Sequence, residues 1–450
     1  MTALSRPLLY AIVFIEGFCS LGVEVVALRR LVPHVGSSIV VTAPTIGFFL
    51  LALALGYASG ARVAERYAAV VGRNFLVSAL LAGIGLAGAT VNTLFTNLQP
   101  AMMAYLVFVG GVVCPLAWLL GQTVPILTNL MEHERVGETS GYALYWSTLG
   151  SFLGSLSLSL IVMQWLGVSA AVLACSLLLG IGTLLLAGFR PRSLFPALAA
   201  AGMAAWINMG GFETVETAYA DYQVVPVELK DQVHPRAFRV NNSTASLIDD
   251  SSPPHYARYV RRLRQVLLEE LGYTDRQILV LGAGGFTLSH REPKNHYTYV
   301  DIDPAIKDIA EKNFLKEPIR GEFVVDDARR FVAVTDKHFD AVVVDVYSSH
   351  TSIPSHLVTR EFWRDARHAL KPDGVLLANL ILDPKLETPY ARNLLATMES
   401  VFGRCSVEVL HRTQTLSNVL ATCYASSQPA TVNLYQDEKN PADTDLARSR

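Results

Sequence analysis

Glycines and acidic residues end four successive apolar runs in the second half of the chain. The first run, "QILVLGAGG", ends in a glycine cluster, and the second, "YTYVDID", reaches its first acid at Asp301. The third, "FVVDDARRF", leads to Asp326 and Asp327, and the fourth, "FDAVVVDVYSS", leads to Asp345. Ligands of parallel α/β sheets bind at the carboxyl ends of the strands, so these residues are predicted to share one site.

The glycines and acids suit the parts of a nucleoside that carries a sulfonium group. Gly282, Gly284 and Gly285 let a ligand approach the backbone where a β-carbon would block it. Asp301 follows Gly282 by 19 residues, where a carboxylate can accept two ribose hydroxyl groups. The acids after the third strand can receive an adenine amino group, and Asp345 would lie beside the reacting centre. Together they predict an S-adenosyl cofactor.

Two other interpretations of these strand ends stay open. A glycine turn followed by an acid also suits a dinucleotide, but the pattern G-x-G-x-x-G fails here because its sixth position is Thr287. Alternatively, the aspartates simply terminate strands in turns.

The elements around these residues predict two folded parts after residue 210. Short β-rich runs over 211–250 predict a small β-sheet. Strands that alternate with helices over 251–427 predict a Rossmann-like α/β domain of the S-adenosylmethionine-dependent methyltransferase type. The polar tail, 428–450, is predicted to be disordered. Predicted strands are 277–283, 297–303, 322–326, 339–346, 374–381, 406–411 and 418–424, and predicted helices are 304–315, 359–370 and 388–402.

Residues 1–210 are predicted to form a multi-pass α-helical membrane domain. Hydrophobic residues make up 51% of the chain, concentrated before Gly211, and the first lysine is Lys230. Crossing the hydrocarbon takes about 20 residues, and seven runs fit that length. These runs are 7–28, 38–59, 75–93, 102–130, 139–163, 166–188 and 193–210.

Two acids in the first apolar run must avoid lipid. A carboxylate at mid-membrane costs on the order of 3 kcal/mol, so Glu16 and Glu24 should face protein or water. One hypothesis is that they line a path for a cation. The alternative is an ion pair with Arg29, Arg30 or another arginine near a membrane face.

The arginines of the apolar half raise a conflict about orientation. In an alternating seven-span arrangement most of them fall on the N-terminal side, which the positive-inside rule puts in the cytoplasm. Seven crossings would then export the C-terminal domain, whereas the predicted cofactor is made in the cytoplasm. We favour a cell-membrane protein with a cytoplasmic catalytic domain, and the side stays open. The N-terminal side holds Arg6, Arg62, Arg66, Arg73, Arg135, Arg190 and Arg192, and the opposite side holds Arg29 and Arg30.

Charge, cysteines and histidines argue against other classes of function. The net charge of -2, with no long basic run, argues against nucleic-acid binding. The five cysteines show no C-x-x-C spacing, so neither a disulfide framework nor a zinc site is predicted. The histidines form no ligand pattern, so no metal is expected.

Over roughly 215–425 the chain resembles the polyamine aminopropyltransferases, the spermidine synthase family, and in particular its membrane-fused bacterial members. The most specific motifs are "ILVLGAGG", "YVDIDP", "VVDDARRF" and "FDAVVVDVYSSHTSIPSHLVTREFWRDARHALKPDGVLLANL". The resemblance implies transfer of an aminopropyl group from decarboxylated S-adenosylmethionine to putrescine or a related amine, which gives a spermidine-type polyamine and methylthioadenosine. A homodimer is one assembly that it allows.

The resemblance also implies roles for individual residues. Asp301 would hold the ribose, Asp327 the adenine, and Tyr256 would lie over the active site. Asp345 would be the catalytic acid residue, and Tyr347 could share its hydrogen bonds to the amine.

Three positions depart from the pattern of soluble family members. Gly285 stands where they carry an acid for the aminopropyl ammonium, Ser348, at the predicted substrate side, replaces a second acid, and Ala257 replaces a glutamine. Fewer anionic groups should bind a dicationic amine less well. Two alternatives therefore remain: a membrane-bound S-adenosylmethionine-dependent methyltransferase, and a sensor or carrier that binds nucleosides or polyamines without turnover.

Overall fold

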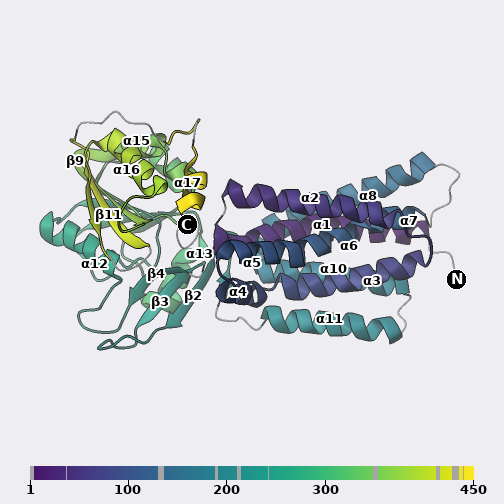
Figure 1. Ribbon diagram of the computed structural model, residues 1–450. Helices are drawn as coiled ribbons and strands as arrows, with labels where there is room; N and C mark the ends of the chain where they lie inside the picture. The colour runs from purple at the N-terminus through teal and green to yellow at the C-terminus, as the bar shows by residue number, and fades with distance from the viewer. Residues whose placement is uncertain are drawn as a thin grey trace. The chain divides into compact units, whose positions relative to one another are not determined.

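The computed structural model of the protein divides into two compact units, described separately below (Figure 1). The first comprises Met1–Val35 and Val41–Ala218, and the second comprises Gly36–Val40 and Tyr219–Arg450. The change of character expected after residue 210 is therefore found at Ala218. The structure describes residues 5–36, 38–129, 136–187, 191–209, 214–241, 243–347, 353–411, 416–427, 435–438 and 440–449.

The first unit is a bundle of apolar helices. Within the described residues, six helical stretches are long and apolar enough to cross a membrane. Its elements are α1 (Arg6–Val35), α2 (Ile39–Gly60), α3 (Tyr67–Leu80) continued by η1 (Leu81–Gly85), α4 (Gly88–Asn97), α5 (Ala101–Phe108), η2 (Val109–Val113), α6 (Cys114–Gly121), α7 (Thr123–Thr128), α8 (Val136–Ser157), η4 (Leu158–Val162), α9 (Met163–Leu166), α10 (Val168–Ala187), α11 (Pro191–Met209) and the strand β1 (Thr214–Glu216).

The predicted spans differ from the helices in two places. The run predicted over 75–93 is broken, because the helix that starts at Tyr67 ends at Gly85. Arg30 Nε donates to the carbonyl of Leu86 at 3.0 Å and so satisfies an acceptor that the helix end leaves free. The seventh predicted span corresponds to α11, whose described apolar stretch, Ser193–Met209, is shorter than the other six spans.

Glu16 and Glu24 both lie inside the bundle, with 1% and 7% of their surfaces exposed. Ser147 Oγ of α8 donates to Glu16 Oε2 at 2.9 Å. Gly17 permits this close approach of α1 and α8, because a β-carbon there would lie 1.9 Å from the Ser147 carbonyl oxygen. The expectation that the two acids face protein is met, and the cation path stays a hypothesis.

The second unit holds two sheets, as predicted. In the small sheet, β2 (Asp221–Pro226), β3 (Arg236–Val240) and β4 (Ser243–Ile248) are antiparallel neighbours. The large sheet has the strand order β10-β11-β9-β8-β5-β6-β7. Its strands β5 (Gln277–Leu281), β6 (His296–Asp301), β7 (Glu322–Val325), β8 (Phe339–Val344) and β9 (Leu370–Leu382) are parallel, and β10 (Ser406–Val409) and β11 (Ser417–Tyr424) join antiparallel.

Helices accompany the parallel strands, which confirms the α/β prediction. β8 is buried at every position, as expected of a central strand covered on both faces. The helices are α12 (Arg258–Arg264) continued by η5 (Gln265–Glu270), α13 (Ala305–Ile309) continued by η6 (Ala310–Leu315), α14 (Ala328–Val334), η7 (Ser355–Leu357), α15 (Arg360–His368), α16 (Pro389–Phe402) and α17 (Ala442–Ser449).

Two features of the second unit correct the sequence analysis. Cys405, the residue before β10, forms a disulfide with Cys423 of the neighbouring strand β11, with their Cα atoms 4.5 Å apart. Only the strand register brings these distant cysteines together. Part of the tail is ordered as well: Tyr435 is buried and its hydroxyl donates to Asp445 Oδ2 of α17 at 2.8 Å.

Candidate active site

The turn after β5 runs directly against the end of β8. Gly282 has a φ of +88°, and a β-carbon there would lie 2.2 Å from the Asp345 carbonyl oxygen. Gly284 also has a positive φ, of +50°. The Asp345 amide donates to the Leu281 carbonyl at 2.9 Å. Glycine is therefore required at position 282, and it brings the predicted cofactor turn beside the predicted catalytic acid.

Asp301 holds this turn from the other side, at the end of β6. Its Oδ2 accepts the amide of Ala283 at 2.9 Å, and its Oδ1 accepts the amide of Asp303 at 3.0 Å. Burial raises the pKa of Asp301 to about 6, although these backbone donors favour its ionised form. Because a carboxylate offers about four acceptor sites, the side chain can still receive a ligand hydroxyl.

Asp345 is held by an amide side chain rather than by the backbone. Asn379 Nδ2, in β9, donates to Asp345 Oδ1 at 2.8 Å, and Asn418 Nδ2 in turn donates to Asn379 Oδ1 at 2.9 Å. Burial raises the pKa of Asp345 to about 6, and the hydrogen bond from Asn379 opposes that rise. The acid is therefore mostly ionised at pH 7 but can be protonated at little cost.

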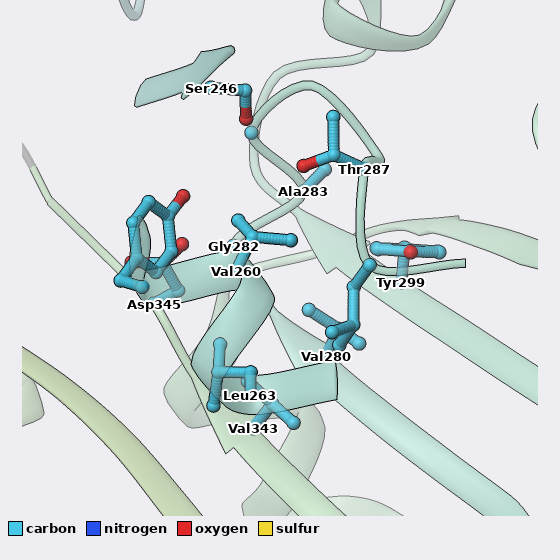
Figure 2. A pocket seen from close by; sticks show the side chains of 13 residues that line it. Ser246, Val260, Leu263, Val280, Gly282, Ala283, Thr287, Tyr299, Val343 and Asp345 are labelled. Carbon is cyan, nitrogen blue, oxygen red and sulfur yellow. The ribbon is translucent and has the colours of Figure 1, made fainter. Parts of the chain in front are cut away.

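Asp345 and the glycine turn line a pocket between α12 and the strand ends (Figure 2). The Tyr259 hydroxyl, on α12, donates to the Ala245 carbonyl at 2.5 Å. The polar side chains along the pocket are Ser246, Tyr259, Thr287, Tyr299 and Asp345, and its apolar wall is Val260, Leu263, Val280, Ala283, Leu288 and Val343.

The structure explains why Gly285 cannot carry the acid found in soluble relatives of the family it resembles. A β-carbon at Gly285 would lie 2.4 Å from the Phe314 ring and 2.8 Å from Ser246 Cβ. The Gly285 amide donates to Ser246 Oγ at 3.0 Å. The space for a longer side chain is thus filled, and Ser246 takes a place beside the turn.

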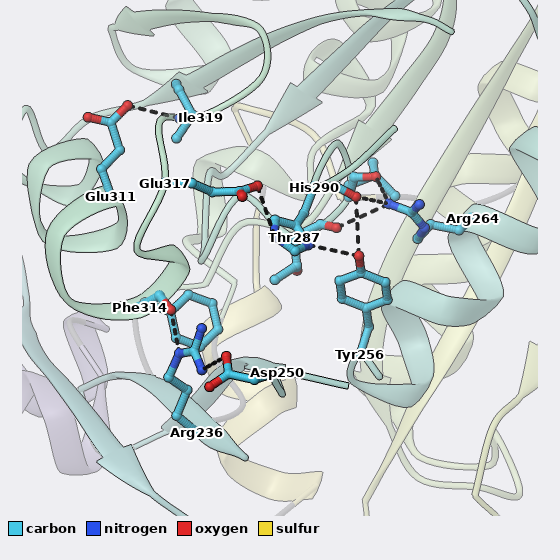
Figure 3. A network of polar contacts seen from close by, with 11 residues as sticks. Arg236, Asp250, Tyr256, Arg264, Thr287, His290, Glu311, Phe314, Glu317 and Ile319 are labelled. Carbon is cyan, nitrogen blue, oxygen red and sulfur yellow. Dashed lines mark hydrogen bonds and ion pairs between the residues drawn. The ribbon is translucent and has the colours of Figure 1, made fainter. Parts of the chain in front are cut away.

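Tyr256 belongs to a polar network behind the glycine turn (Figure 3). Its hydroxyl lies 2.8 Å from His290 Nδ1 and donates to the His290 carbonyl at 3.1 Å. His290 Nε2 lies 3.0 Å from Glu317 Oε1, and Arg264 lies over the Tyr256 ring. Burial lowers the pKa of His290 to about 4, so this histidine is neutral at pH 7. The network fixes the segment that follows the turn, and among the described residues Tyr256 does not line the pocket.

The remaining predicted residues lie around the site rather than in this pocket. Asp327 caps α14, because its Oδ1 accepts the Arg330 amide at 3.0 Å. The Asp326 amide donates to the Asp301 carbonyl at 3.0 Å, which places the second and third strand ends side by side. The Tyr347 hydroxyl donates to the Asn379 carbonyl at 2.7 Å. Ser348 lies outside the described residues.

Sequence reasoning missed Tyr259, Ser246 and Asn379 as site residues. Asn379 carried a usable signal, since it is the one polar residue in the apolar run "GVLLANLIL". Ser246 carried none, because nothing local indicates that β4 reaches the glycine turn.

The stretch of sequence that contains this site is similar to a known protein family. Residues 264–436 match the family model of the spermine/spermidine synthase domain. These residues are therefore similar to the spermine/spermidine synthase family. The match contains the strand ends, the glycine turn, Asp345 and Asn379.

The similar proteins cover different parts of the chain. The polyamine aminopropyltransferase of Vibrio vulnificus is 33% identical over 156 residues, which cover 33% of this chain and 50% of that protein. The chain thus spans about half the length of that curated relative. The polyamine aminopropyltransferase of Mycobacterium tuberculosis is 26% identical over 416 residues, or 83% of this chain and 77% of that protein. The crystal structure of a probable spermidine synthase from Corynebacterium glutamicum aligns with 52% of this chain and 84% of that chain at a TM-score of 0.41 and 19% identity.

Proposed function

We propose that this protein is a membrane-bound aminopropyltransferase. It would transfer the aminopropyl group of decarboxylated S-adenosylmethionine to putrescine or a related amine, giving a spermidine-type polyamine and methylthioadenosine. The observation that carries the proposal is Asp345, a carboxylate with a pKa of about 6 that lines the pocket beside the glycine turn of a spermine/spermidine synthase domain.

The chemistry requires a group that binds an ammonium and then takes its proton. A primary amine with a pKa near 10 is almost fully protonated at pH 7, and freeing the neutral nucleophile costs about 4 kcal/mol. Asp345 would first pair with the ammonium. As the nitrogen bonds to the carbon next to sulfur and the carbon–sulfur bond breaks, the proton passes to Asp345 and the electron pair leaves with methylthioadenosine.

Three side chains support Asp345 in this role. Asn379 orients the carboxylate through the 2.8 Å hydrogen bond to Oδ1. Tyr347 uses its proton on the Asn379 carbonyl, so towards the ammonium its oxygen would act as an acceptor. Tyr259 adds a further hydroxyl to the lining of the pocket. Correct placement of the amine contributes the rest of the rate enhancement.

The nucleoside would bind across the neighbouring strand ends. Asp301 would accept the ribose hydroxyl groups while it holds the Ala283 amide. Asp326 and Asp327 would face the adenine, and the glycine turn at Gly282 would pass under the ligand. These assignments follow the strand-end geometry and the family resemblance.

The helical unit suggests where the protein resides. Apolar side chains as large as Trp165 and Trp206 are 79% and 82% exposed on the bundle. Such surface is unstable in water and favourable in a bilayer, so we place this unit in the membrane.

One observation favours a methyltransferase as the second candidate. The site beside Gly285 is filled by Phe314 and Ser246, so it offers no acid to an aminopropyl ammonium. Intact S-adenosylmethionine, which carries a carboxylate, would not suffer from that loss.

Calorimetry and product analysis separate the candidates. The purified full chain should bind methylthioadenosine and decarboxylated S-adenosylmethionine, and mass spectrometry should detect an amine lengthened by one aminopropyl group. Binding of the intact cofactor alone, with a methylated product, would select the methyltransferase. Binding without any product would indicate a sensor or carrier.

A further inference from the structure

The last apolar helix of the bundle crosses it completely. α10 ends beside the start of α3, because Thr183 Oγ1 donates to the Gly72 carbonyl at 3.3 Å. α11 follows and finishes near the end of η1, where Asn208 Nδ2 donates to the Gly83 carbonyl at 2.7 Å. Its 19 residues span about 28 Å at 1.5 Å per residue, close to the hydrocarbon thickness. α11 therefore adds a seventh crossing to the six other spans.

Glu216 fixes the end of the bundle from which the chain leaves. Its Oε1 accepts from Arg30 Nη1 at 2.6 Å, near the end of α1, and its Oε2 accepts the Ser169 amide at 2.6 Å, at the start of α10. Hydrogen bonds to Arg30 and Ser169 lower the pKa of Glu216, although burial opposes this effect. The α1 C-terminus and the α10 N-terminus both lie at the end opposite to the N-terminus, so the chain departs there.

The charges at the two ends of the bundle are unequal. At the N-terminal end, the connecting sequences carry arginines such as Arg62 and Arg66, and the sequences of the later connections at this end contain Arg135 and Arg190. At the opposite end, the segments 36–38, 86–100 and 167 contain no lysine or arginine. Arg29 and Arg30 lie at that end but both are buried: Arg29 Nη2 donates to the Thr217 carbonyl at 3.0 Å, and Arg30 pairs with Glu216. The positive-inside rule places the arginine-rich end in the cytoplasm.

The disulfide of the second unit gives an independent indication of compartment. Cys405 and Cys423 are bonded, whereas Cys19, Cys114 and Cys175 of the helical unit are free. Structural disulfides persist in oxidising compartments and are rare in the cytosol.

We infer that the chain crosses the membrane seven times and that the domain after Ala218 lies outside the cytoplasm. This is the side opposite to the one that the sequence analysis favoured. The consequence for substrates rests on the proposed function: the acceptor amine comes from outside the cytoplasm, and a transport step must deliver the sulfonium nucleoside. The topology itself does not depend on that function.

Reporter fusions to the full chain test the topology. Alkaline phosphatase fused after Arg450 should be active, because it folds only after export, and green fluorescent protein at the same position should be dark. An N-terminal fluorescent fusion, the matched control, should be bright. An inactive phosphatase fusion together with a fluorescent C-terminal green fluorescent protein fusion would overturn the inference, even if the protein transfers aminopropyl groups.

The state of the cysteines gives a second test that needs no fusion. Cells are denatured in N-ethylmaleimide, and the peptides are then analysed without reduction. Cys405 and Cys423 should be joined in wild-type protein, and the bond should be lost in a host that lacks its extracytoplasmic thiol oxidase. Free, alkylated Cys405 and Cys423 in the normal host would contradict export.

Discussion

Asp301 and Asp345 lie at the ends of the two strands that flank β5. Their pKa values are raised alike, but their hydrogen-bond partners differ. Burial raises the pKa of each to about 6. Both oxygens of Asp301 accept backbone amides, from Ala283 and Asp303. Asp345 instead accepts a side-chain amide from Asn379 and lines the pocket. The perturbed pKa marks both residues, but only their partners distinguish the residue that holds the turn from the proposed proton acceptor.

Replacing Asp345, the proposed proton acceptor, should have the largest effect. In Asp345→Asn the side chain cannot take a proton, so kcat should fall by about 10³-fold. The affinity for methylthioadenosine should stay within about twofold, because the glycine turn and Asp301 are untouched. Steady-state kinetics and calorimetry measure the two quantities. Unchanged turnover would refute the role of Asp345.

Asp301→Asn, the matched substitution, should act mainly on binding. An asparagine amide keeps one acceptor oxygen, so one of the two backbone amides loses its charged partner, at a cost of about 1.5–3 kcal/mol. We expect methylthioadenosine to bind at least about 10-fold more weakly and the melting temperature to fall, with a smaller loss of kcat at saturating substrate. If instead kcat falls as far as in Asp345→Asn at unchanged affinity, the contrast between the two acids is wrong.

The positioning of Asp345 by Asn379 can be tested separately. Asn379→Leu removes a hydrogen bond that lowers the pKa of Asp345, so that pKa should rise further above 6 and less carboxylate remains at pH 7. We expect kcat/KM at pH 7 to fall by about 10-fold and to recover partly at higher pH. Asn418→Ala, one contact further away, is the control and should produce a smaller change. A uniform loss at every pH would indicate only a structural role.

The wild-type pH profile should show the same acid directly. A carboxyl group with a raised pKa of about 6 is protonated below that pH and cannot accept a proton. The value of kcat/KM should therefore drop by about 10-fold per pH unit below pH 6. This fall of kcat/KM below pH 6 should persist in Asp301→Asn, since Asp301 is assigned to binding. If the fall below pH 6 disappears in Asp301→Asn, the titrating group is Asp301 and not Asp345.

The third strand end should respond least. Asp327 caps α14, so Asp327→Ala should cost about 1 kcal/mol in the free energy of unfolding. Asp327→Ser keeps a capping oxygen but removes the carboxylate, so stability should be largely retained. A loss of nucleoside affinity of about threefold in the serine variant would support a contact with adenine. Equal affinities in wild type and both variants would leave Asp327 with the cap alone.

Much of the second unit could be predicted because its signals are local. Apolar runs that end in glycine or aspartate predicted β5, β6, β7 and β8, and the sheet order confirms that these strands are neighbours. The helix α14 was missed, because Asp327 was interpreted as a ligand residue and not as a helix cap. One aspartate can serve both purposes, and sequence alone does not choose between them.

The residues that sequence reasoning missed are those defined by distant contacts. Ser246 precedes Gly285 by 39 positions, and Asn379 follows Asp345 by 34 positions, yet each pair is hydrogen-bonded. Cys405 and Cys423 likewise meet only through the register of β10 and β11. No local pattern encodes such pairings.

The sequence by itself determined the apolar helices, the α/β alternation and the chemical character of the strand ends, because hydrophobic periodicity and turn residues act over a few neighbours. Tertiary structure alone decided that Asp345 opens to a pocket while Asp301 is tied to the backbone. It also decided that Phe314 fills the space beside Gly285 and that Glu216 forms an ion pair with Arg30. These outcomes depend on which surfaces pack together, and packing is a property of the whole fold.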